Sequence, residues 1–491
     1  MTALTLAQSI LAVPPFPRAN PHDIVVARPG ASARPGEARE VVSALRRERV
    51  GGAFWNENRD PWRHPPIGDS DAEALLRRIA SSQPVDEPLK AAVDKALLSD
   101  LAWRNPFTGE PIELVALIAL LGHWRRLIEE NRGIVAAFGF ASWKRDTVEP
   151  LLWDGSSGPT FAAPTPSLLA SIPTGARVAC WKARVTPEEL AIIDDRFAVV
   201  EVEDGFIRSV GLGADCVPPL SVVIDDRGGH YNPAVPNRLE AIIQQPDFSQ
   251  DQLTRAADLR ALIVRHGIGK YGVAGEQSAT SFDESRPEHP ENRRIVLVIG
   301  QVEDDRSVRF GSPIVRSNLA LLEAARKLEP DAYIIYRPHP DVTAGHRIGS
   351  IPKARAEQLA DEIDAMSPIS DLLSRADALH TMTSLAGFEA LMRGKEVVCH
   401  GQPFYSGWGL TKDLAGKPAR RTARPTIDEL AAAVLLTYPR YLDPVTNLPC
   451  TPEILVMRLM AGITRQNDAL VPMRRLQGLL RRAVARLGKS I

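Results

Sequence analysis

A short acidic segment follows one of the most apolar stretches of this sequence. The run 294–300 is expected to form a buried strand, and 301–307 (QVEDDRS) comes directly after it. Three consecutive acids repel one another and are usually solvated. At the carboxyl end of a strand, however, a carboxylate can also act as a nucleophile or a base. On the residues alone, both interpretations stay open.

A rigid histidine follows a second predicted strand. Residues 332–336 (AYIIY) are strand-like, and Arg337, Pro338, His339 and Pro340 come next. The prolines restrict the backbone of the histidine between them. A lone histidine is more often structural, but one held rigidly beside an arginine is suited to gripping a phosphate or donating a proton to a leaving phosphate.

A third segment combines a helix start with a glycine- and aromatic-rich loop. Ser384 stands at an N-cap position, and the helix after it is expected to end at Arg393-Gly394. The free N–H groups there form an anion site, and Glu389 is placed to reach ribose hydroxyls unless it is an ordinary exposed glutamate. The strand 397–399 then leads into 400–409, which lies where open α/β sheets bind ligands.

The first half of the chain offers an acidic counterpart. The segment 203–209 (EDGFIRS) ends a predicted strand, and an acid there can act as general acid/base on an acceptor hydroxyl. Two basic pairs, Lys144/Arg145 and Lys182/Arg184, follow neighbouring predicted strands. They are expected to make that side of the site basic and suited to an anionic acceptor.

The elements that carry these groups alternate between strand and helix in two series, which predicts an α/β protein with two Rossmann-like domains facing a cleft. The polar stretch 274–292 separates the series. We expect four segments: an N-terminal extension (1–106), an acceptor domain (107–280), a nucleotide-sugar donor domain (290–440) and closing helices with a basic tail (441–491). The Pro/Arg-rich extension is expected to have modest order, with short helices at 38–49, 71–80 and 88–101 and no strand series.

Composition narrows the class further. The 491 residues are 44% hydrophobic and 24% charged, and the net charge of −1 gives no general attraction to nucleic acid. The four cysteines are far apart, which favours buried reduced thiols in a cytosolic protein. No apolar run is long enough to span a membrane, and no basic segment precedes the apolar start, so no signal peptide is expected. Dinucleotide, P-loop and serine-hydrolase motifs are absent.

The C-terminus has a basic amphipathic pattern. Residues 473–487 place leucines and a valine on one helical face and arginines mostly on the others. This pattern is typical either of a closing helix with a solvated face or of a segment, here 473–489, that contacts an anionic membrane surface.

Taken together, several long motifs resemble the capsular polysaccharide biosynthesis/export proteins, the retaining β-Kdo transferases that build a poly-Kdo linker on a phosphatidylglycerol lipid (Kdo is the acidic sugar ketodeoxyoctulosonate). The motifs are EDGFIRSVGLG from residue 203, QVEDDRS from residue 301, the His-Pro pair, and QPFYSGWGLT from residue 402. The resemblance covers about 133–459. It implies a GT-B type fold and a double displacement through a Kdo–aspartate intermediate.

The resemblance also implies roles for single residues. The pattern Gln-x-x-x-Asp-x-Ser falls on Gln301, Asp305 and Ser307, which makes Asp305 the expected nucleophile and Asp304 the fallback. Glu203 is the expected general acid/base, with Asp204 as the alternative. His339 and Arg337 are expected at the leaving phosphate, Ser384 and Glu389 at the donor nucleotide, and Gln402 beside the sugar. Neither a metal nor another cofactor is expected, because one phosphate needs little neutralisation.

The best-known relatives in this family carry two such modules in tandem, whereas this chain carries one. The implied partners are CMP-Kdo as donor substrate, a phosphatidylglycerol-type glycolipid as acceptor, and the capsule export machinery. A cytoplasmic location, peripheral on the inner face of the inner membrane, is expected. Two alternatives remain open: an enzyme of the same fold that uses another nucleotide sugar, and a non-catalytic export or scaffold protein.

Overall fold

The computed structural model describes residues 2–63, 70–81, 83–209, 216–270, 272–273, 293–345 and 347–464. The predicted polar linker, the predicted basic tail and the part of the 203–213 motif beyond Ser209 lie outside these residues. The chain divides into two compact units. Unit 1 comprises Met1–Ala179, Ala191–Ala198 and Leu442–Cys450, and unit 2 comprises Cys180–Leu190, Val199–Tyr441 and Thr451–Ile491. The four predicted segments remain a prediction.

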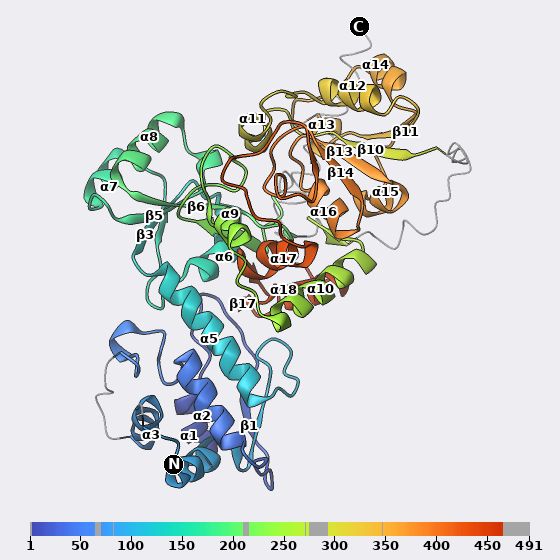
Figure 1. Cartoon of the computed structure of the whole chain (residues 1–491). Coiled ribbons are helices and arrows are strands. Elements are labelled where there is room, and N and C mark those ends of the chain that lie inside the picture. Colours follow the sequence, from blue (N-terminus) through green and yellow to red (C-terminus); the bar gives the residue numbers. More distant parts are fainter. Residues whose placement is uncertain are drawn as a thin grey trace. The chain divides into compact units, whose positions relative to one another are not determined.

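Unit 2 contains a six-stranded sheet in which every pairing is parallel (Figure 1). Across the sheet the strands are β12 (Glu362–Ile363), β11 (Tyr333–Arg337), β10 (Ile295–Ile299), β13 (Ala378–Thr381), β14 (Glu396–Cys399) and β15 (Lys412–Asp413). In chain order this is the doubly wound order 3-2-1-4-5-6, whose switch point lies between β10 and β13. The Rossmann-like prediction for the second series is confirmed.

Helices cover this sheet, and two further short helices start at its carboxyl edge. Helices α12 (Asn318–Leu328) and α14 (Lys353–Leu359) lie on one side, and α15 (Ile369–Arg375) lies on the other (Figure 1). The alternation of β10 explains the first contact, because Val296 and Val298 join one buried cluster with α12 and α14. Directly after β10 and β11 come α11 (Arg306–Gly311) and α13 (Pro340–Thr343).

A second set of strands in unit 2 runs antiparallel. Strand β7 (Ser221–Asp225) pairs antiparallel with both β6 (Ala198–Asp204) and β16 (Pro439–Leu442). This pairing departs from the strand–helix alternation expected for the first series, because β6 and β7 follow each other directly among the assigned elements and are antiparallel.

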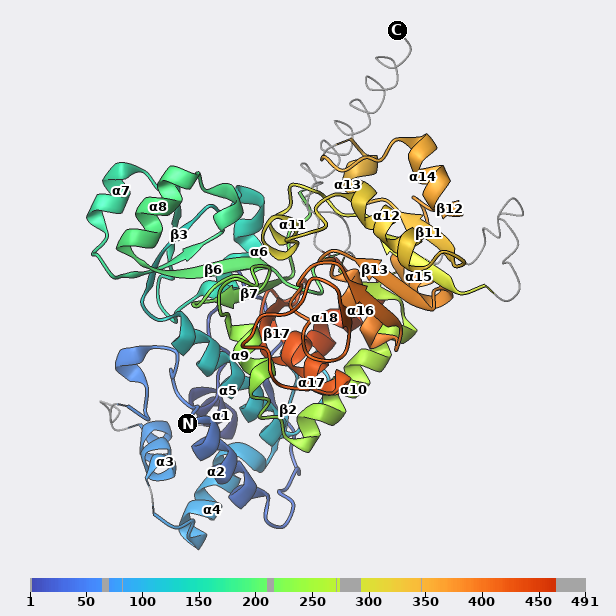
Figure 2. The ribbon, with the colours of Figure 1, turned by 45° about the horizontal axis from the view of Figure 1, so that its top comes forward.

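Unit 2 contains five further helices among the described residues. They are α9 (Arg238–Gln244), α10 (Gln250–Arg265), α16 (Ala386–Met392), α17 (Ile427–Ala431), continued by a π-helical turn to Thr437, and α18 (Pro452–Met460). Helix α10 lies along α17 in both ribbon views (Figures 1 and 2), and Arg260 forms an ion pair of 2.9 Å with Asp428. A short hairpin, β8 (Ile268–Gly269) and β9 (Gly272–Val273), follows α10.

Unit 1 is more ordered at its N-terminus than the sequence led us to expect. Helices α1 (Ala3–Ile10), α2 (Glu37–Glu48), α3 (Asp71–Ala80) and α4 (Glu87–Val93) all bury apolar side chains. Strand β1 (Val25–Ala27) pairs with β2 (Leu101–Trp103), a contact between distant residues that no local pattern reveals. The predicted helix 88–101 is therefore too long, because its last residue begins β2.

The rest of unit 1 follows the predicted alternation. It contains α5 (Leu114–Asn131), β3 (Ile134–Phe138), α6 (Ser142–Leu152), β4 (Thr160–Ala162), α7 (Pro166–Ser171) and β5 (Arg177–Cys180), and α8 (Pro187–Arg196) crosses from unit 2 into unit 1. Strands β3 and β4 are parallel, and β4 was not predicted. All four cysteines are buried and unbonded to one another, as expected. Among the described residues, no helix has the length and hydropathy of a membrane span.

Candidate functional site

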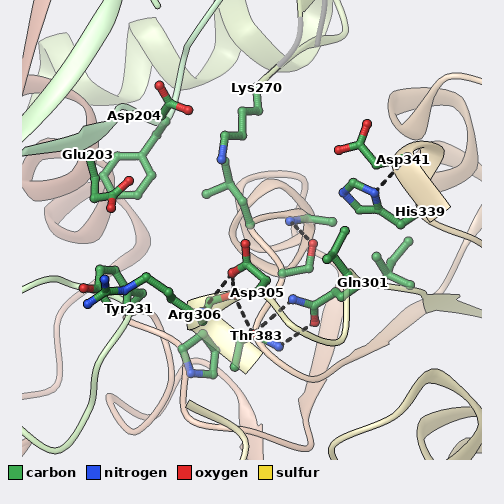
Figure 3. Close-up of a pocket in the computed structure, with 18 of the residues that line it drawn as sticks. Glu203, Asp204, Tyr231, Lys270, Gln301, Asp305, Arg306, His339, Asp341 and Thr383 are labelled. Carbon is green, nitrogen blue, oxygen red and sulfur yellow. Dashed lines mark hydrogen bonds between the residues drawn. The ribbon is translucent and has the colours of Figure 1, made fainter. Parts of the chain in front are cut away.

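One large pocket opens at the carboxyl edge of the parallel sheet in unit 2. Its volume is about 1060 Å³, enough for a nucleotide sugar. One wall comes from the turns after β10, β11 and β13, and the other comes from loops near residues 182–190, 203–206, 230–231 and 267–270. Figure 3 shows charged side chains converging on it from both walls. The pocket lies at the switch point that the strand order predicts.

Asp305 stands at the start of helix α11 and faces the open pocket. It is the N-cap residue, and its Oδ1 accepts hydrogen bonds from the backbone N–H of Ser307 at 2.8 Å and from its hydroxyl at 2.6 Å. Its neighbour Asp304 is exposed and forms an ion pair of 2.9 Å with Arg347. Both acids line the pocket, but only the Asp305 carboxylate is oriented by the turn itself.

Gln301 holds this turn against the neighbouring strand. Its buried side-chain amide donates to the Thr383 hydroxyl at 3.0 Å, and its carbonyl accepts from the Thr383 N–H at 2.8 Å. The Thr383 hydroxyl in turn lies 3.3 Å from the Ser307 hydroxyl. A continuous chain of hydrogen bonds therefore runs from β13 to Asp305. Gln301 thus joins the segment after β10 to the segment after β13 by hydrogen bonds across the switch point.

His339 lies across the pocket from Glu203 and Asp204 (Figure 3). Its Nδ1 accepts a hydrogen bond of 3.1 Å from the backbone N–H of Asp341. A neutral ring with this partner carries its proton on Nε2 and can donate from there. Burial lowers the pKa of His339, and the attraction of Asp341 only partly offsets this. The neutral donor form is thus favoured near pH 7.

Arg337 and Ser384 line the same wall. Arg337 is half-buried and donates to the Asp364 carbonyl oxygen at 3.0 Å; burial lowers its pKa, yet an arginine stays charged. The N-cap of α16 is Leu385, one residue later than predicted, and no side chain caps the helix. Ser384 instead accepts a hydrogen bond from the Ala386 N–H at 3.2 Å. Ser384 therefore borders the pocket without being the cap.

Glu203 and Asp204 end strand β6 on the opposite wall (Figure 3). Asp204 forms an ion pair of 2.9 Å with the buried Arg208. Glu203 is half-buried and stands opposite Val223 in the β6–β7 ladder. Both carboxylates line the pocket, so the choice between them as general acid/base stays a prediction.

Glu389 is not the ordinary exposed helix glutamate that the sequence allowed, and its role at the nucleotide stays a prediction. It is buried rather than exposed, and its Oε1 accepts a hydrogen bond of 3.1 Å from the backbone N–H of Lys270. Burial raises the pKa of this carboxyl, which the nearby Arg393 only partly counteracts. Glu389 lines the pocket and also fixes the backbone of Lys270.

The loop after β14 is packed rather than open. Gln402 does not line the pocket; its amide donates to the Ala415 carbonyl oxygen at 2.9 Å, whereas Pro403 and Phe404 form the wall. The buried Arg421 donates to the carbonyl oxygens of Pro403 and Ser406 at 2.7 and 2.9 Å. Most of the aromatic loop is therefore structural.

The predicted basic pairs differ in what the structure tests. Lys182 lines the pocket and lies 3.8 Å from Glu201, but Arg184 is not among the lining residues. Lys144 and Arg145 belong to unit 1, where the first lies over Trp143 and the second over Phe161. A basic acceptor side built from both pairs stays a prediction.

Three pocket residues were missed by sequence reasoning. Lys270 extends into the pocket from the loop after α10, and Arg306 and Tyr231 meet at its left side in Figure 3. The signals were weak: Lys270 follows Gly267-Ile268-Gly269, and Tyr231 follows Gly228-Gly229. Glycine pairs of this kind mark close approaches of the backbone, which is the available clue. No cluster with metal-ligand character occurs in the described part of the chain.

A doubly wound sheet with two facing carboxylates, a histidine donor and several cations at its switch point defines a class. This is an α/β protein of the GT-B type, the architecture of many nucleotide-sugar transferases. The comparisons with known proteins agree. Two solved structures of KpsC from Thermosulfurimonas dismutans, titled beta Kdo 2,7 transferase and beta Kdo 2,4 transferase, match with a TM-score of 0.55 each. They are 31% and 28% identical, and each match covers 67% of this chain and 99% of the other.

The sequence comparisons point the same way. The model of the capsule polysaccharide biosynthesis protein family matches residues 177–441. The chain is 38% identical over 418 residues to the capsule polysaccharide modification protein LipA of Neisseria meningitidis serogroup A, covering 85% of this chain and 56% of LipA. It is 35% identical over 330 residues to the lipopolysaccharide-processing protein LpsZ of Rhizobium meliloti, covering 66% of this chain and 73% of LpsZ.

The chain belongs to the capsule polysaccharide biosynthesis protein family. It spans little more than half the length of LipA, 56%. The resemblance expected from the sequence motifs is confirmed.

Proposed function

We propose that this protein is a retaining β-Kdo glycosyltransferase that uses CMP-Kdo to extend a lipid-linked acceptor in capsule biosynthesis. The observation that carries the proposal is the Asp305 carboxylate, oriented by two hydrogen bonds from Ser307 and facing a large pocket with Glu203 on its other wall. Support for the donor comes from the similarity to structures titled beta Kdo transferases.

In the first half-reaction, an Asp305 oxygen forms a bond to the anomeric carbon of Kdo. The bond from that carbon to the phosphate oxygen breaks, and CMP leaves with the electron pair. His339, donating from Nε2, Arg337 and Lys270 all line the pocket and would offset the charge on the leaving phosphate. Ser384 and Glu389 would border the nucleotide. No metal is required for this step.

In the second half-reaction, an acceptor hydroxyl attacks the same carbon. Glu203 takes the hydroxyl proton as the new bond forms, and the Asp305 oxygen departs as a carboxylate. Two inversions give net retention, the logic of retaining glycosidases. The two carboxylates lie on opposite walls of the pocket: Glu203 belongs to β6, and Asp305 is the N-cap residue of α11.

The partners follow from this proposal. The acceptor would be a phosphatidylglycerol-type glycolipid, and the product would pass to the capsule export machinery. The enzyme would then work at the cytoplasmic face of the inner membrane, with residues 473–489 as a candidate contact to anionic lipid.

Intact-mass measurement tests the proposal. Wild-type protein incubated with CMP-Kdo alone is expected to gain the mass of one Kdo residue, because the intermediate has no acceptor. The Glu203→Gln variant is expected to accumulate the same adduct even with acceptor present, and Asp305→Ala is expected to form none. If wild type shows neither an adduct nor CMP release with any lipid acceptor, the proposal is wrong.

A further inference from the structure

Arg306 occupies an unusual position beside the proposed nucleophile. It is the first residue of helix α11, directly after Asp305, and it lines the pocket. Its guanidinium carbon lies 4.9 Å from the centre of the Tyr231 ring and 5.6 Å from that of Phe310. Figure 3 shows the side chain running from the Asp305 turn towards Tyr231. The two rings hold a charged group at the edge of the reaction site.

The aromatic platform is itself fixed. The Tyr231 hydroxyl donates a hydrogen bond to the buried Glu201, and the other oxygen of Glu201 lies 3.8 Å from the ammonium group of Lys182. Tyr231 therefore cannot turn away without leaving a buried carboxylate short of a partner. The orientation of Arg306 is set by a side chain from a different part of unit 2.

Part of the hydrogen-bonding capacity of Arg306 is unused. Its Nε is buried and has no hydrogen-bond partner among the described residues. A guanidinium offers five N–H donors in a planar fork that matches a carboxylate. Arg306 lines the pocket, so the remaining N–H donors of this ring-stacked guanidinium are suited to bind an anionic group of the substrate.

The chemistry of the donor identifies that group. The anomeric carbon of a 2-keto sugar acid bears a carboxylate, so attack by Asp305 brings two negative charges close together. Like charges at such a distance oppose the reaction unless a cation stands beside both. A neutral sugar poses no such problem, and it would leave the half-buried Arg306 without a counter-charge.

We propose that Arg306, positioned by Tyr231, binds the carboxylate of a 2-keto acid donor sugar next to Asp305 and so selects acidic over neutral donors. This inference rests on the proposed function and names the residue that sets its donor class. Lys270 and His339, the groups proposed for the leaving phosphate, reach the pocket from other sides of Asp305 than Arg306 does (Figure 3).

Single-turnover adduct formation at varied CMP-Kdo concentration tests the assignment. Arg306→Ala is expected to lower the ratio of rate to half-saturating concentration about 100-fold, and Arg306→Lys, which keeps the charge without the fork, about 10-fold. Tyr231→Phe keeps the ring but removes the hydrogen bond to Glu201 that fixes it, so a loss of about threefold is expected, whereas Tyr231→Leu removes the platform and should lower the ratio about 10-fold. Calorimetric affinity for CMP alone should be unchanged in all four variants.

The matched control is Arg355→Ala, which removes an exposed arginine of α14 that is paired with Glu323 at 2.7 Å. It should alter neither readout. If wild type forms no adduct, the proposed function fails and this inference fails with it. If wild type reacts and Arg306→Ala reacts equally well, only the inference is overturned. Equal losses in CMP affinity and in adduct formation would also overturn it, because Arg306 would then serve the nucleotide or the fold.

Discussion

The turn after β10 and the loop after β14 both follow strands of the same parallel sheet, but one faces the pocket and the other is packed inside the protein. The turn after β10, residues 301–307, presents Asp305 to the pocket, whereas the loop after β14, residues 400–408, turns nearly all its polar groups inward. Both lie at carboxyl ends of strands, where ligands bind in this architecture. The two segments differ in where the hydrogen-bond donors to their polar groups come from. The Asp305 carboxylate accepts its hydrogen bonds from Ser307 in the same turn, while the loop carbonyls accept theirs from Arg421 outside the loop.

The largest expected difference is between separate substitutions of the two adjacent acids, Asp305 and Asp304. Asp305→Asn keeps a good N-cap but removes the nucleophile, so we expect turnover of CMP-Kdo with acceptor to fall about 10⁴-fold. Asp304→Asn removes only the exposed ion pair with Arg347, so a loss of less than about 10-fold is expected. Similar losses in the two variants would show that the orientation of Asp305 does not decide the chemistry.

The packed loop should respond in stability instead. Arg421 is buried, donates to Glu240 at 2.7 Å and also holds two loop carbonyls. Arg421→Met leaves these acceptors short of a donor, so we expect a loss of about 3–5 kcal/mol in the free energy of unfolding, measured with urea. Arg355→Ala, the exposed control, should cost less than about 1 kcal/mol. A small effect of Arg421→Met would mean that the loop is not held as described.

His400, at the start of the same loop, forms a buried pair with His380, and this pair makes the stability of the protein depend on pH. Nδ1 of His380 lies 3.1 Å from Nε2 of His400 in the core. Burial lowers the pKa of His400 to about 4, and burial followed by the charges of His400, Lys412 and Arg294 lowers that of His380 to about 3. Glu329, 3.8 Å from His380, does not reverse this.

The sign follows from linkage. The unfolded chain binds protons at about pH 6.5 while the folded chain does not, so the stabilisation is complete above that pH and is lost as the pH falls from about 6.5 towards 4. Two histidines give a slope of about 2.7 kcal/mol per pH unit, and His400→Gln should reduce it by about 1.4. Urea unfolding at pH 5.0, 5.5 and 6.0 measures the slope. An unchanged slope in the variant would contradict the buried neutral pair.

The smallest expected effect concerns Gln402. Because its amide holds the Ala415 carbonyl oxygen and does not line the pocket, Gln402→Ala should change kcat and KM for CMP-Kdo less than about threefold and cost about 1 kcal/mol of stability. A rise in KM of tenfold or more would instead place this side chain beside the sugar, as the family motif implies.

Local pattern predicted the four central strands of the second α/β series but not its two-residue edge strands, β12 and β15. Its strands and helices start and end within a few residues of the apolar runs, and the acids, the histidine and Arg337 fall on one pocket because parallel strands end at one edge. Pattern could not reveal which side chains find partners inside the fold. Gln301 and Glu389 bind within the protein, and that depends on Thr383 and Lys270 from other elements.

Contacts between distant segments account for the other misses. The β1–β2 pairing and the antiparallel β6–β7 pair depend on which segments meet in space rather than on periodicity. Tyr231 gives no sign in the sequence that it supports Arg306, because the two are joined only through the folded pocket. The role of such residues can be recognised only from the positions of their loops in the folded protein.

The hydrogen bonds of the Asp305 turn skip one position. Asp305 is bound to Ser307, and Ser307 to Thr383, whereas the side chain of residue 306 takes no part in that chain. Under the roles proposed for Asp305 and Arg306, a substitution at 306 would alter which donor the pocket accepts without disturbing the group that reacts. Reactivity and donor preference would then be encoded in adjacent codons, and one mutation could change the second alone.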